Sequence, residues 1–269
     1  VALLDDSGNL SESVRQSLPS TWRVFSVTQS PRCGHITGRY LIERGHRRIA
    51  YFTGWPGTQW SVNRQAGLLR ACTDSAGFAT LLTFEPSCSA PGHIQASADE
   101  PLFETLTETM AALSFTPPPN SLAFSLLRDD TFNVLHRFER HTALRDTVMP
   151  LLEQALSDTR ITAWVCASDA LAQHCLTFLR AARRSVPGDV SVVSFDDTQT
   201  AVRHHLSSYN FNPYGLAAAI IGAVLNPTRF ARAHPEAVVE IDGFVRERRT
   251  VASVSTAGVP DDPAGEEIS

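Results

Sequence analysis

The sequence predicts an α/β protein whose strands form parallel, doubly wound sheets. Three observations lead to this class. Short apolar runs alternate with helical segments along most of the chain. The runs are apolar almost throughout, as parallel strands buried on both faces must be. The helical segments stop at glycines or polar turns, as helices between successive strands do.

In the first part of the chain, glycines and polar turns separate the expected elements. The apolar run 1–4 is followed by two acids and a polar, turn-rich segment. Gly45 ends the first expected helix and Gly77 ends the second. The elements expected here are strands at 24–28, 48–54 and 79–84 and helices at about 31–44 and 61–76.

Residues 85–144 are rich in proline and serine, which favours loops. Between the loops "EPSCSAPGH" and "TPPPN" we expect a helical segment at 101–113. A strand at 121–127 and a helix at 129–140 complete this region.

The last part of the chain contains the clearest amphipathic helix, at 168–184, with Ser168 as its N-cap. A helix at 213–226 begins with proline in its first turn. Residues 237–252 fit one or two terminal strands, and the small, acidic tail 254–269 fits a disordered segment. The other elements expected here are a helix at about 145–157 and strands at 161–167, 190–195 and 206–211.

Composition narrows the class of function. The 269 residues carry a formal net charge of −5 and the pI is near 6.0, whereas a free-standing DNA-binding domain usually has a basic face and a high pI. The basic cluster "ERGHRRI" is interpreted as a solvated turn. The five cysteines include no CxxC pair, so we expect a reducing, cytoplasmic setting without disulfides. No run reaches the roughly 18 apolar residues of a membrane span.

The residues that follow the strands predict a binding site, because ligands of open α/β sheets lie beyond the carboxyl ends of the strands. Carboxylates accept hydrogen bonds from hydroxyl groups, arginine donates them, and indole rings stack on the apolar faces of sugars. This set therefore suits a polyhydroxylated ligand. The residues in question are Asp5, Asp6, Trp55, Trp60, Arg64, Ser168, Asp169, Asp196, Asp197, Asn212 and Tyr214.

Each of these residues also has a structural interpretation. Asp169 and Asp196 also fit helix caps or turn residues, and the two tryptophans also fit packing at a rim. Arg64 also fits an exposed charge on a helix.

Catalytic and metal-binding motifs are missing from the sequence. It has no Gly-x-Ser-x-Gly elbow, no glycine-rich phosphate loop and no His-Glu-x-x-His motif. His204 and His205 are adjacent and would point to opposite faces of a strand. Paired acids in one cleft can do acid–base chemistry, but nothing supplies a nucleophile. We therefore predict no catalytic residue, no metal and no cofactor.

Four blocks of sequence resemble the effector domain of LacI/GalR-type bacterial transcriptional regulators, a domain that also occurs behind GntR-type DNA-binding heads. The resemblance covers about 1–80 and 145–252, and the closing "GFVRERRTVA" is similar to the terminal strand of that family. The blocks are "GHITGRYLIERGHRRIAYFTG", "SVNRQAGLLRACTDSAG", "TAWVCASDALAQHCLTFLRAARRSVPGDVSVVSFDD" and "LSSYNFNPYGLAAAIIGAVL".

The resemblance implies a two-lobed fold like that of type I periplasmic binding proteins, with parallel sheets and three crossovers between the lobes. A sugar or purine-like effector would lie between the lobes. The family's first lobe opens with several βα units that this chain lacks, so we expect a truncated first lobe with exposed apolar surface and strand edges. The expected division is 1–23 and 198–228 for the remnant of the first lobe, 24–197 and 229–253 for the second lobe, and 254–269 for the tail.

The resemblance also assigns site residues by position. Asp5, Asp169 and Asp196 match effector-contacting acids, and Arg64 matches the arginine that grips the ligand. Phe211 lies near a ligand-lining position, and Ser168 stands where the family usually has Asn. Two further departures are Ser194 in place of Gly and Gln29 in place of an acid. These departures affect the identity of the ligand more than the fold.

The expected function is sensing of an effector, most simply a sugar, by a transcriptional regulator. The effector would change the arrangement of the lobes and so control DNA binding through a head that this chain lacks. The family usually works as homodimers, since its operators are often palindromic. One alternative is a solute-binding protein of a sugar transporter, and the other is an α/β enzyme that acts on a sugar with the Asp196–Asp197 pair.

Overall fold

The computed structural model describes most of the chain outside one long central segment. The described residues are 2–5, 13, 17–19, 22–26, 30–87, 144–235 and 238–254. The elements expected at 101–113, 121–127 and 129–140 and the tail beyond residue 254 lie outside them.

The larger of two sheets has six strands in the order β4-β3-β5-β6-β7-β9. Its first five strands are parallel, and β9 joins antiparallel to β7. The apolar runs of the sequence form these strands because both faces of the sheet are covered by helices. The strands are β3 Arg48–Phe52, β4 Thr80–Phe84, β5 Ala163–Cys166, β6 Ser191–Phe195, β7 Ser207–Asn210 and β9 Phe244–Arg246.

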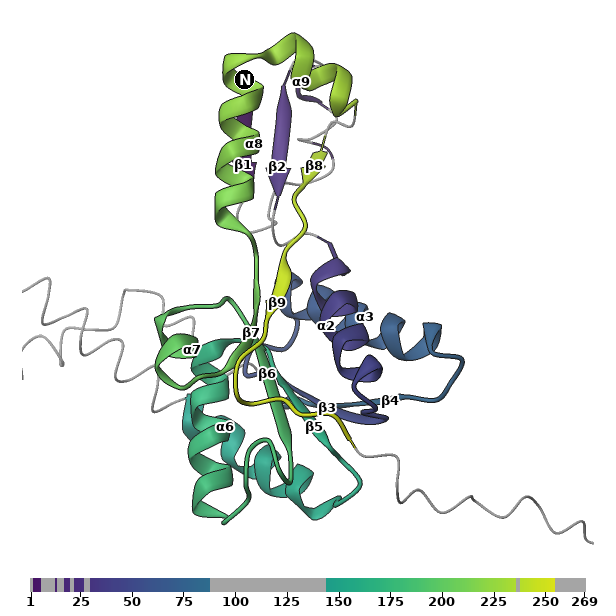
Figure 1. The fold of residues 1–269 in the computed structure, drawn as a ribbon, viewed down its shortest axis with the longest axis vertical. Coiled ribbons are helices and arrows are strands. Elements are labelled where there is room, and N and C mark those ends of the chain that lie inside the picture. The colour runs from purple at the N-terminus through teal and green to yellow at the C-terminus, as the bar shows by residue number, and fades with distance from the viewer. Residues whose placement is uncertain are drawn as a thin grey trace, which may run out of the picture.

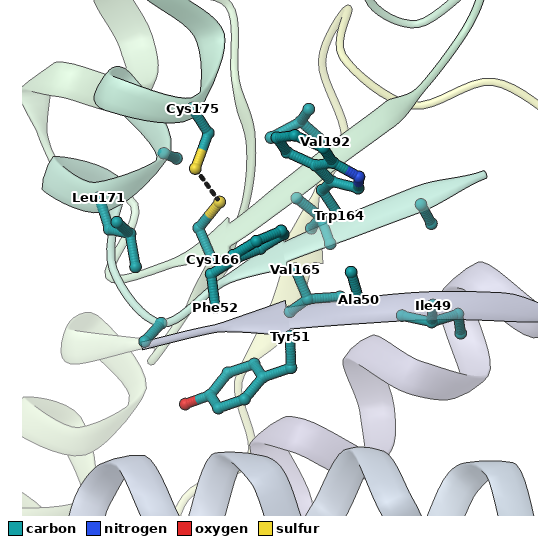
Figure 2. Packing of buried hydrophobic residues seen from close by; sticks show 14 of the residues in the cluster. Ile49, Ala50, Tyr51, Phe52, Trp164, Val165, Cys166, Leu171, Cys175 and Val192 are labelled. Atoms are coloured by element: carbon teal, nitrogen blue, oxygen red, sulfur yellow. Dashed lines mark hydrogen bonds between the residues drawn. The ribbon is translucent and has the colours of Figure 1, made fainter. Parts of the chain in front are cut away.

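Helices α2 (Arg32–Glu43) and α3 (Gln59–Asp74) pack together on one side of this sheet. Helix α6 (Asp169–Ala181) packs on the other side, along with helical residues 144–157. Figure 2 shows Tyr51 on the face toward α3, whereas the side chains of Cys166 and Cys175 meet between the sheet and α6. Their sulfur atoms lie 3.4 Å apart and both are free thiols.

The smaller sheet has three parallel strands in the order β1-β2-β8, which are Ala2–Asp5, Arg23–Ser26 and Val238–Glu240. Helices α8 (Pro213–Leu225) and α9 (Pro227–Ala233) cover it. Its core is small and centres on Phe25, Leu216 and Val239.

The two sheets form two lobes, as Figure 1 shows, and the chain passes between them three times. The first crossover joins β2 to α2, the second joins β7 to α8, and the third joins β8 to β9. The predicted two-lobed α/β fold with parallel sheets is therefore confirmed. No helix in the described ranges is long and apolar enough to cross a membrane.

Strand pairing differs from the expected division of the lobes at several points. β2 belongs to the smaller sheet although 24–28 was expected in the second lobe, and β7 belongs to the larger sheet although 206–211 was expected in the first. Residues 237–252 form two strands that lie in different sheets. Parallel strands pair with partners far away in sequence, so local pattern does not reveal which sheet they join. Two short helices, α7 (Gln199–Arg203) and α9, were not predicted.

The described part of the small lobe leaves apolar surface uncovered. Ile221, Val224 and Leu225 of α8 are exposed, and so is Leu4 on the edge strand β1. A helix that is apolar around its whole circumference is normally buried. The described part of the small lobe does not bury α8 in this way.

His46 forms hydrogen bonds that hold the chain after β9 against the edge of the larger sheet. It is 2% exposed, its Nε2–H donates to the carbonyl of Ala252 at 3.0 Å, and its Nδ1 accepts from the Thr162 hydroxyl at 2.9 Å. Burial lowers the pKa of His46 below its ordinary value of 6.5, although the bond to Ala252 opposes this shift. The folded protein therefore holds His46 neutral at a pH where the unfolded chain binds a proton.

We expect the free energy of unfolding to be highest above pH 6.5 and to fall as the pH drops below that value. The decrease from this one group is at most about 1.4 kcal/mol per pH unit. Urea denaturation at a series of pH values measures it, with His46→Gln as the variant that flattens the slope and His234→Gln as the matched control. An unchanged slope in His46→Gln would contradict the assignment.

Candidate functional site

The carboxyl ends of both sheets face the region between the lobes. β7 ends at Asn210 and leads directly into α8 of the small lobe, and β3, β5 and β6 run parallel to β7. In the small lobe, β2 leads into α2 of the large lobe, and β1 runs parallel to β2. Residues that follow these strands are therefore brought together between the lobes (Figure 1).

Arg64 is the charged centre of the site. It lies on α3, is only 6% exposed, and donates from Nη1 to the carbonyl of Ala167 at the end of β5. Its Nη2 donates to Oδ1 of Asp196 at 3.0 Å. A buried guanidinium needs such partners, because an unpaired buried charge is strongly unfavourable. The interpretation of Arg64 as an exposed helix charge is therefore wrong.

Three aromatic rings surround the Arg64 guanidinium. Its Cζ lies 4.7 Å from the ring centroid of Trp60, 4.9 Å from that of Phe195 and 5.1 Å from that of Phe211. Trp55 packs on Trp60 with 5.6 Å between ring centroids. Trp55, Trp60, Arg64, Asp196 and Phe211, all predicted from the sequence, thus form one cluster.

Asp196 is presented by an unusual turn after β6. Asp196 and Asp197 have φ values of 102° and 48°, which residues with side chains rarely adopt. The Asp196 N–H donates to the carbonyl of Tyr209 at 3.0 Å and holds the turn against β7. The side chain is 34% exposed, so it is open to an incoming molecule. Loss of hydration raises the pKa of Asp196, Arg64 opposes the shift, and Asp169 adds to it.

Asp169 has a different role from the one predicted, because its carboxylate is buried inside the lobe. It is 1% exposed. Oδ1 accepts from the hydroxyls of Ser194 at 2.5 Å and Ser208 at 2.7 Å. Oδ2 accepts from the N–H and the hydroxyl of Thr198 at 2.6 and 2.8 Å. All four bonds are to the protein, so Asp169 positions the turn that carries Asp196 and does not face the ligand region.

The hydroxyl of Ser168 also forms a hydrogen bond within the protein. Its hydroxyl caps α6 by accepting from the N–H of Leu171 at 3.3 Å, as its N-cap prediction required. The cap leaves the O–H donor of Ser168 unused, and its predicted contact with a ligand stays a prediction. Ser194, which the resemblance places where that family has glycine, donates a hydrogen bond to Asp169.

Asp197 does not share the role of Asp196. It is bound by Arg248 Nη2 and Asn210 Nδ2, both at 2.6 Å, and its side chain is 6% exposed. This ion pair ties the turn after β6 to the chain that follows β9, and the bond from Asn210 ties the same turn to β7. The two adjacent carboxylates thus point to different partners, and they do not form a catalytic pair.

Helix α3 is held in place by backbone contact and by Tyr51. A Cβ atom on Gly67 would overlap the carbonyl oxygen of Pro31, so α2 and α3 touch at their backbones. The Tyr51 hydroxyl, whose pKa burial raises to about 12, bonds to Ser61 in the first turn of α3. These contacts fix the helix that carries Trp60 and Arg64.

Two parts of the cluster were not predicted, Phe195 and the Ala167 carbonyl. Phe195 belongs to a buried strand, and a sequence pattern does not distinguish a core phenylalanine from one that contacts a ligand-binding arginine. Its position directly before Asp196 was the available indication.

Asp5 ends β1 and pairs in register with Ser26, but its side chain lies outside the described residues. Among those residues, no group of His, Cys, Asp and Glu could hold a metal ion.

A small cavity of about 20 Å³ lies where the three crossovers meet. Ser26 and Cys33 line it from the first crossover, Tyr209 from the second and Ile241 from the third. Across it, Arg32 forms an ion pair with Asp242 at 2.6 Å, and the Tyr209 hydroxyl accepts from the Gly243 N–H at 2.9 Å. The crossovers are thus linked to one another beside the Arg64 cluster.

Comparison with known proteins supports this architecture. Residues 126–251 match the family of periplasmic binding protein-like domains. None of the curated protein sequences matches the chain.

Similar solved structures extend the comparison to nearly the whole chain. A sugar-binding transcriptional regulator of the LacI family from Escherichia coli, complexed with phosphate, is 17% identical with a TM-score of 0.56, and the match covers 94% of this chain and 77% of that one. A LacI-family regulator from Enterococcus faecium with bound ribose is 14% identical, with a TM-score of 0.54 and coverage of 94% and 80%. The Escherichia coli repressor ascG is 18% identical, with a TM-score of 0.55 and coverage of 93% and 78%. The domain match and these structures confirm the resemblance drawn from the sequence at the level of domain and fold.

Substitution of Asp169 tests its structural role. We expect Asp169→Asn to lower the free energy of unfolding by about 3 kcal/mol, because an amide places a donor against the hydroxyl and N–H donors that now bind a carboxylate. Chemical denaturation measures this change. Asp146→Asn, at a side chain that is 62% exposed, is the control and should change stability little. Equal stabilities of the two variants would contradict the role of Asp169.

Proposed function

We propose that this chain, which contains a periplasmic binding protein-like domain, is the effector-sensing part of a bacterial transcriptional regulator of the LacI/GalR type. It binds a sugar between its lobes and has no catalytic role. The observation that carries this proposal is the Arg64–Asp196 pair, which is enclosed by aromatic rings where the carboxyl ends of the strands face the other lobe. The names of the similar structures, one of them with bound ribose, support the same function.

The chemistry of the cluster suits a polyhydroxylated molecule. Asp196 gives one oxygen to Arg64 and leaves the other to accept from ligand hydroxyls. Arg64 uses two of its five N–H groups in bonds to the protein. The rings of Trp60 and Phe211 supply apolar faces on which a sugar ring stacks. We propose that Asp5, which ends β1, contributes to the same site from the small lobe.

The two-lobed fold offers a way to couple ligand binding to DNA binding. A ligand held by both lobes favours the arrangement in which it makes contacts on both sides, and this preference is the free energy available for regulation. We propose that regulation also involves a DNA-binding head and the second protomer of a homodimer. We place the regulator in the cytoplasm, where the buried free thiols of Cys33, Cys72, Cys166 and Cys175 stay reduced.

The other two candidate functions have less support. A solute-binding protein of a transporter would share the fold, but no feature of the described residues favours it over a regulator. An enzyme would need Asp197 as the second acid, and Arg248 already holds that carboxylate in an ion pair.

Two substitutions test the site. We expect Arg64→Ala and Asp196→Ala each to weaken sugar binding at least about tenfold, because each leaves a buried polar partner without its bond. A thermal-shift screen of pentoses and hexoses, beginning with ribose, finds the ligand, and calorimetry then measures affinity. Arg70→Ala, at a side chain of the same helix that is 74% exposed, should bind normally. Unchanged affinity in both site variants would show that the site lies elsewhere, and turnover of the sugar would contradict a sensing role.

Binding should also depend on pH through Asp196. A protonated carboxyl cannot accept from a ligand hydroxyl with both oxygens, so affinity falls as the pH drops through the pKa of Asp196. Because that pKa is raised above its ordinary value of 3.8, the fall begins at a higher pH than for an ordinary aspartate. Calorimetry at decreasing pH measures it, and Asp196→Asn should bind weakly without this dependence. Constant affinity down to pH 3.8 would exclude Asp196 as the titrating group.

A further inference from the structure

A second cavity lies in the large lobe at the edge of the sheet opposite to the Arg64 cluster. Helix α6 starts beside the carboxyl end of β5 and runs back along the sheet, so its last turn reaches the amino-terminal edge. The segments before β6 and before β7 begin at the same edge. The cavity has a volume of about 280 Å³ and lies among these segments and the chain that follows β9.

Among the described residues, the lining of this cavity is strongly basic and includes no acidic side chain. Five basic side chains line it, namely Arg180, Arg184, His204, His205 and Arg249. Three of them are arginines, which stay charged at any physiological pH. This concentration of positive charge is unusual in a chain whose net charge is −5.

Within the described ranges, none of these five side chains forms an ion pair or a side-chain hydrogen bond. Other arginines of the same lobe, such as Arg48 and Arg248, bind a carboxylate directly. The nearby Asp189 does not line the cavity, and its carboxylate accepts from the N–H and hydroxyl of Ser185. Hydrogen bonds from Ser185, with a smaller contribution from Arg184, lower the pKa of Asp189.

The helix dipole explains only part of the cluster. Arg180 lies in the last turn of α6, where a positive charge is favourable. Arg249 follows β9 and His205 follows α7, so neither belongs to α6. Their convergence on one cavity therefore needs a different explanation.

The backbone that carries the cluster is held by hydrogen bonds. The Arg249 N–H donates to the carbonyl of His205 at 2.9 Å, and the Arg184 N–H donates to the carbonyl of Leu179 at 2.8 Å. Thr250 at the cavity wall donates from its hydroxyl to Val192 and accepts from the Ser207 N–H. The backbone positions from which the basic side chains project are thus held in place, so binding a ligand need not order the backbone.

We propose that this cavity binds a small anion with two or more phosphate groups. Guanidinium forks match the oxygen geometry of phosphate and form paired, charge-assisted hydrogen bonds. The imidazoles of His204 and His205 add donors. Three fixed positive charges in a concave site are best balanced by a compact anion that carries several negative charges.

Pyrophosphate is the probe, titrated into the full chain by calorimetry in about 150 mM NaCl, where diffuse electrostatic attraction is screened. We expect saturable binding with one site per chain. Arg180→Ala and Arg249→Ala should each weaken it at least about tenfold, because each removes a charge-assisted pair of hydrogen bonds. Arg249→Lys keeps the charge but loses the paired N–H donors of the guanidinium. Its affinity for pyrophosphate should lie between those of wild type and Arg249→Ala.

Arg203→Ala is the matched control, since it removes the same charge beside the cavity from a residue that does not line it. It should bind pyrophosphate as wild type does. Circular dichroism confirms that each variant is folded. Failure of wild type to show saturable binding, or an equal loss of affinity in Arg203→Ala, would overturn the proposal.

A second comparison separates this site from the sugar site. Arg64→Ala should keep pyrophosphate binding, and Arg180→Ala should keep sugar binding. Loss of pyrophosphate binding in Arg64→Ala with retention in Arg180→Ala would place the anion between the lobes and refute the second site.

Discussion

The buried carboxylate of Asp169 is the interaction on which the candidate site depends. It lies at the start of α6 and joins β6 through Ser194, β7 through Ser208 and the start of α7 through Thr198. Four hydrogen bonds to one carboxylate make its burial tolerable, because they replace the water that it has lost. The turn that these bonds enclose carries Asp196 in a backbone conformation that would otherwise be unfavourable.

The second half of the site depends on how closely two helices approach. Glycines at the contact between α2 and α3 bring the helix backbones together and set the depth of α3 against the sheet. From this depth Arg64 reaches the end of β5 and the Asp196 carboxylate at the same time. The aromatic rings around it exclude water, which strengthens these bonds. Close packing within the large lobe thus fixes the side chains of the candidate site relative to one another.

Much of this arrangement could be predicted from the sequence, because parallel strands place their carboxyl ends at one edge. That rule predicted that four residues lie close together although they are widely separated in the chain, namely Trp60, Arg64, Asp196 and Phe211. It did not distinguish Asp196 from Asp169, since both follow a buried strand and only the packed structure shows which carboxylate faces inward. The local sequence pattern also could not predict which sheet β2 and β7 join, because their partner strands are distant in sequence. The basic cavity was missed because its residues come from the ends of three separate segments.

The triple passage of the chain between the lobes has a mechanical consequence. A single linker would let one lobe rotate in any direction relative to the other. Three connections, joined to one another by Arg32 with Asp242 and by Tyr209 with Gly243, restrict the relative orientations of the lobes more than one linker would. A molecule bound between the lobes, as proposed, would therefore select among few arrangements of the lobes and not among many.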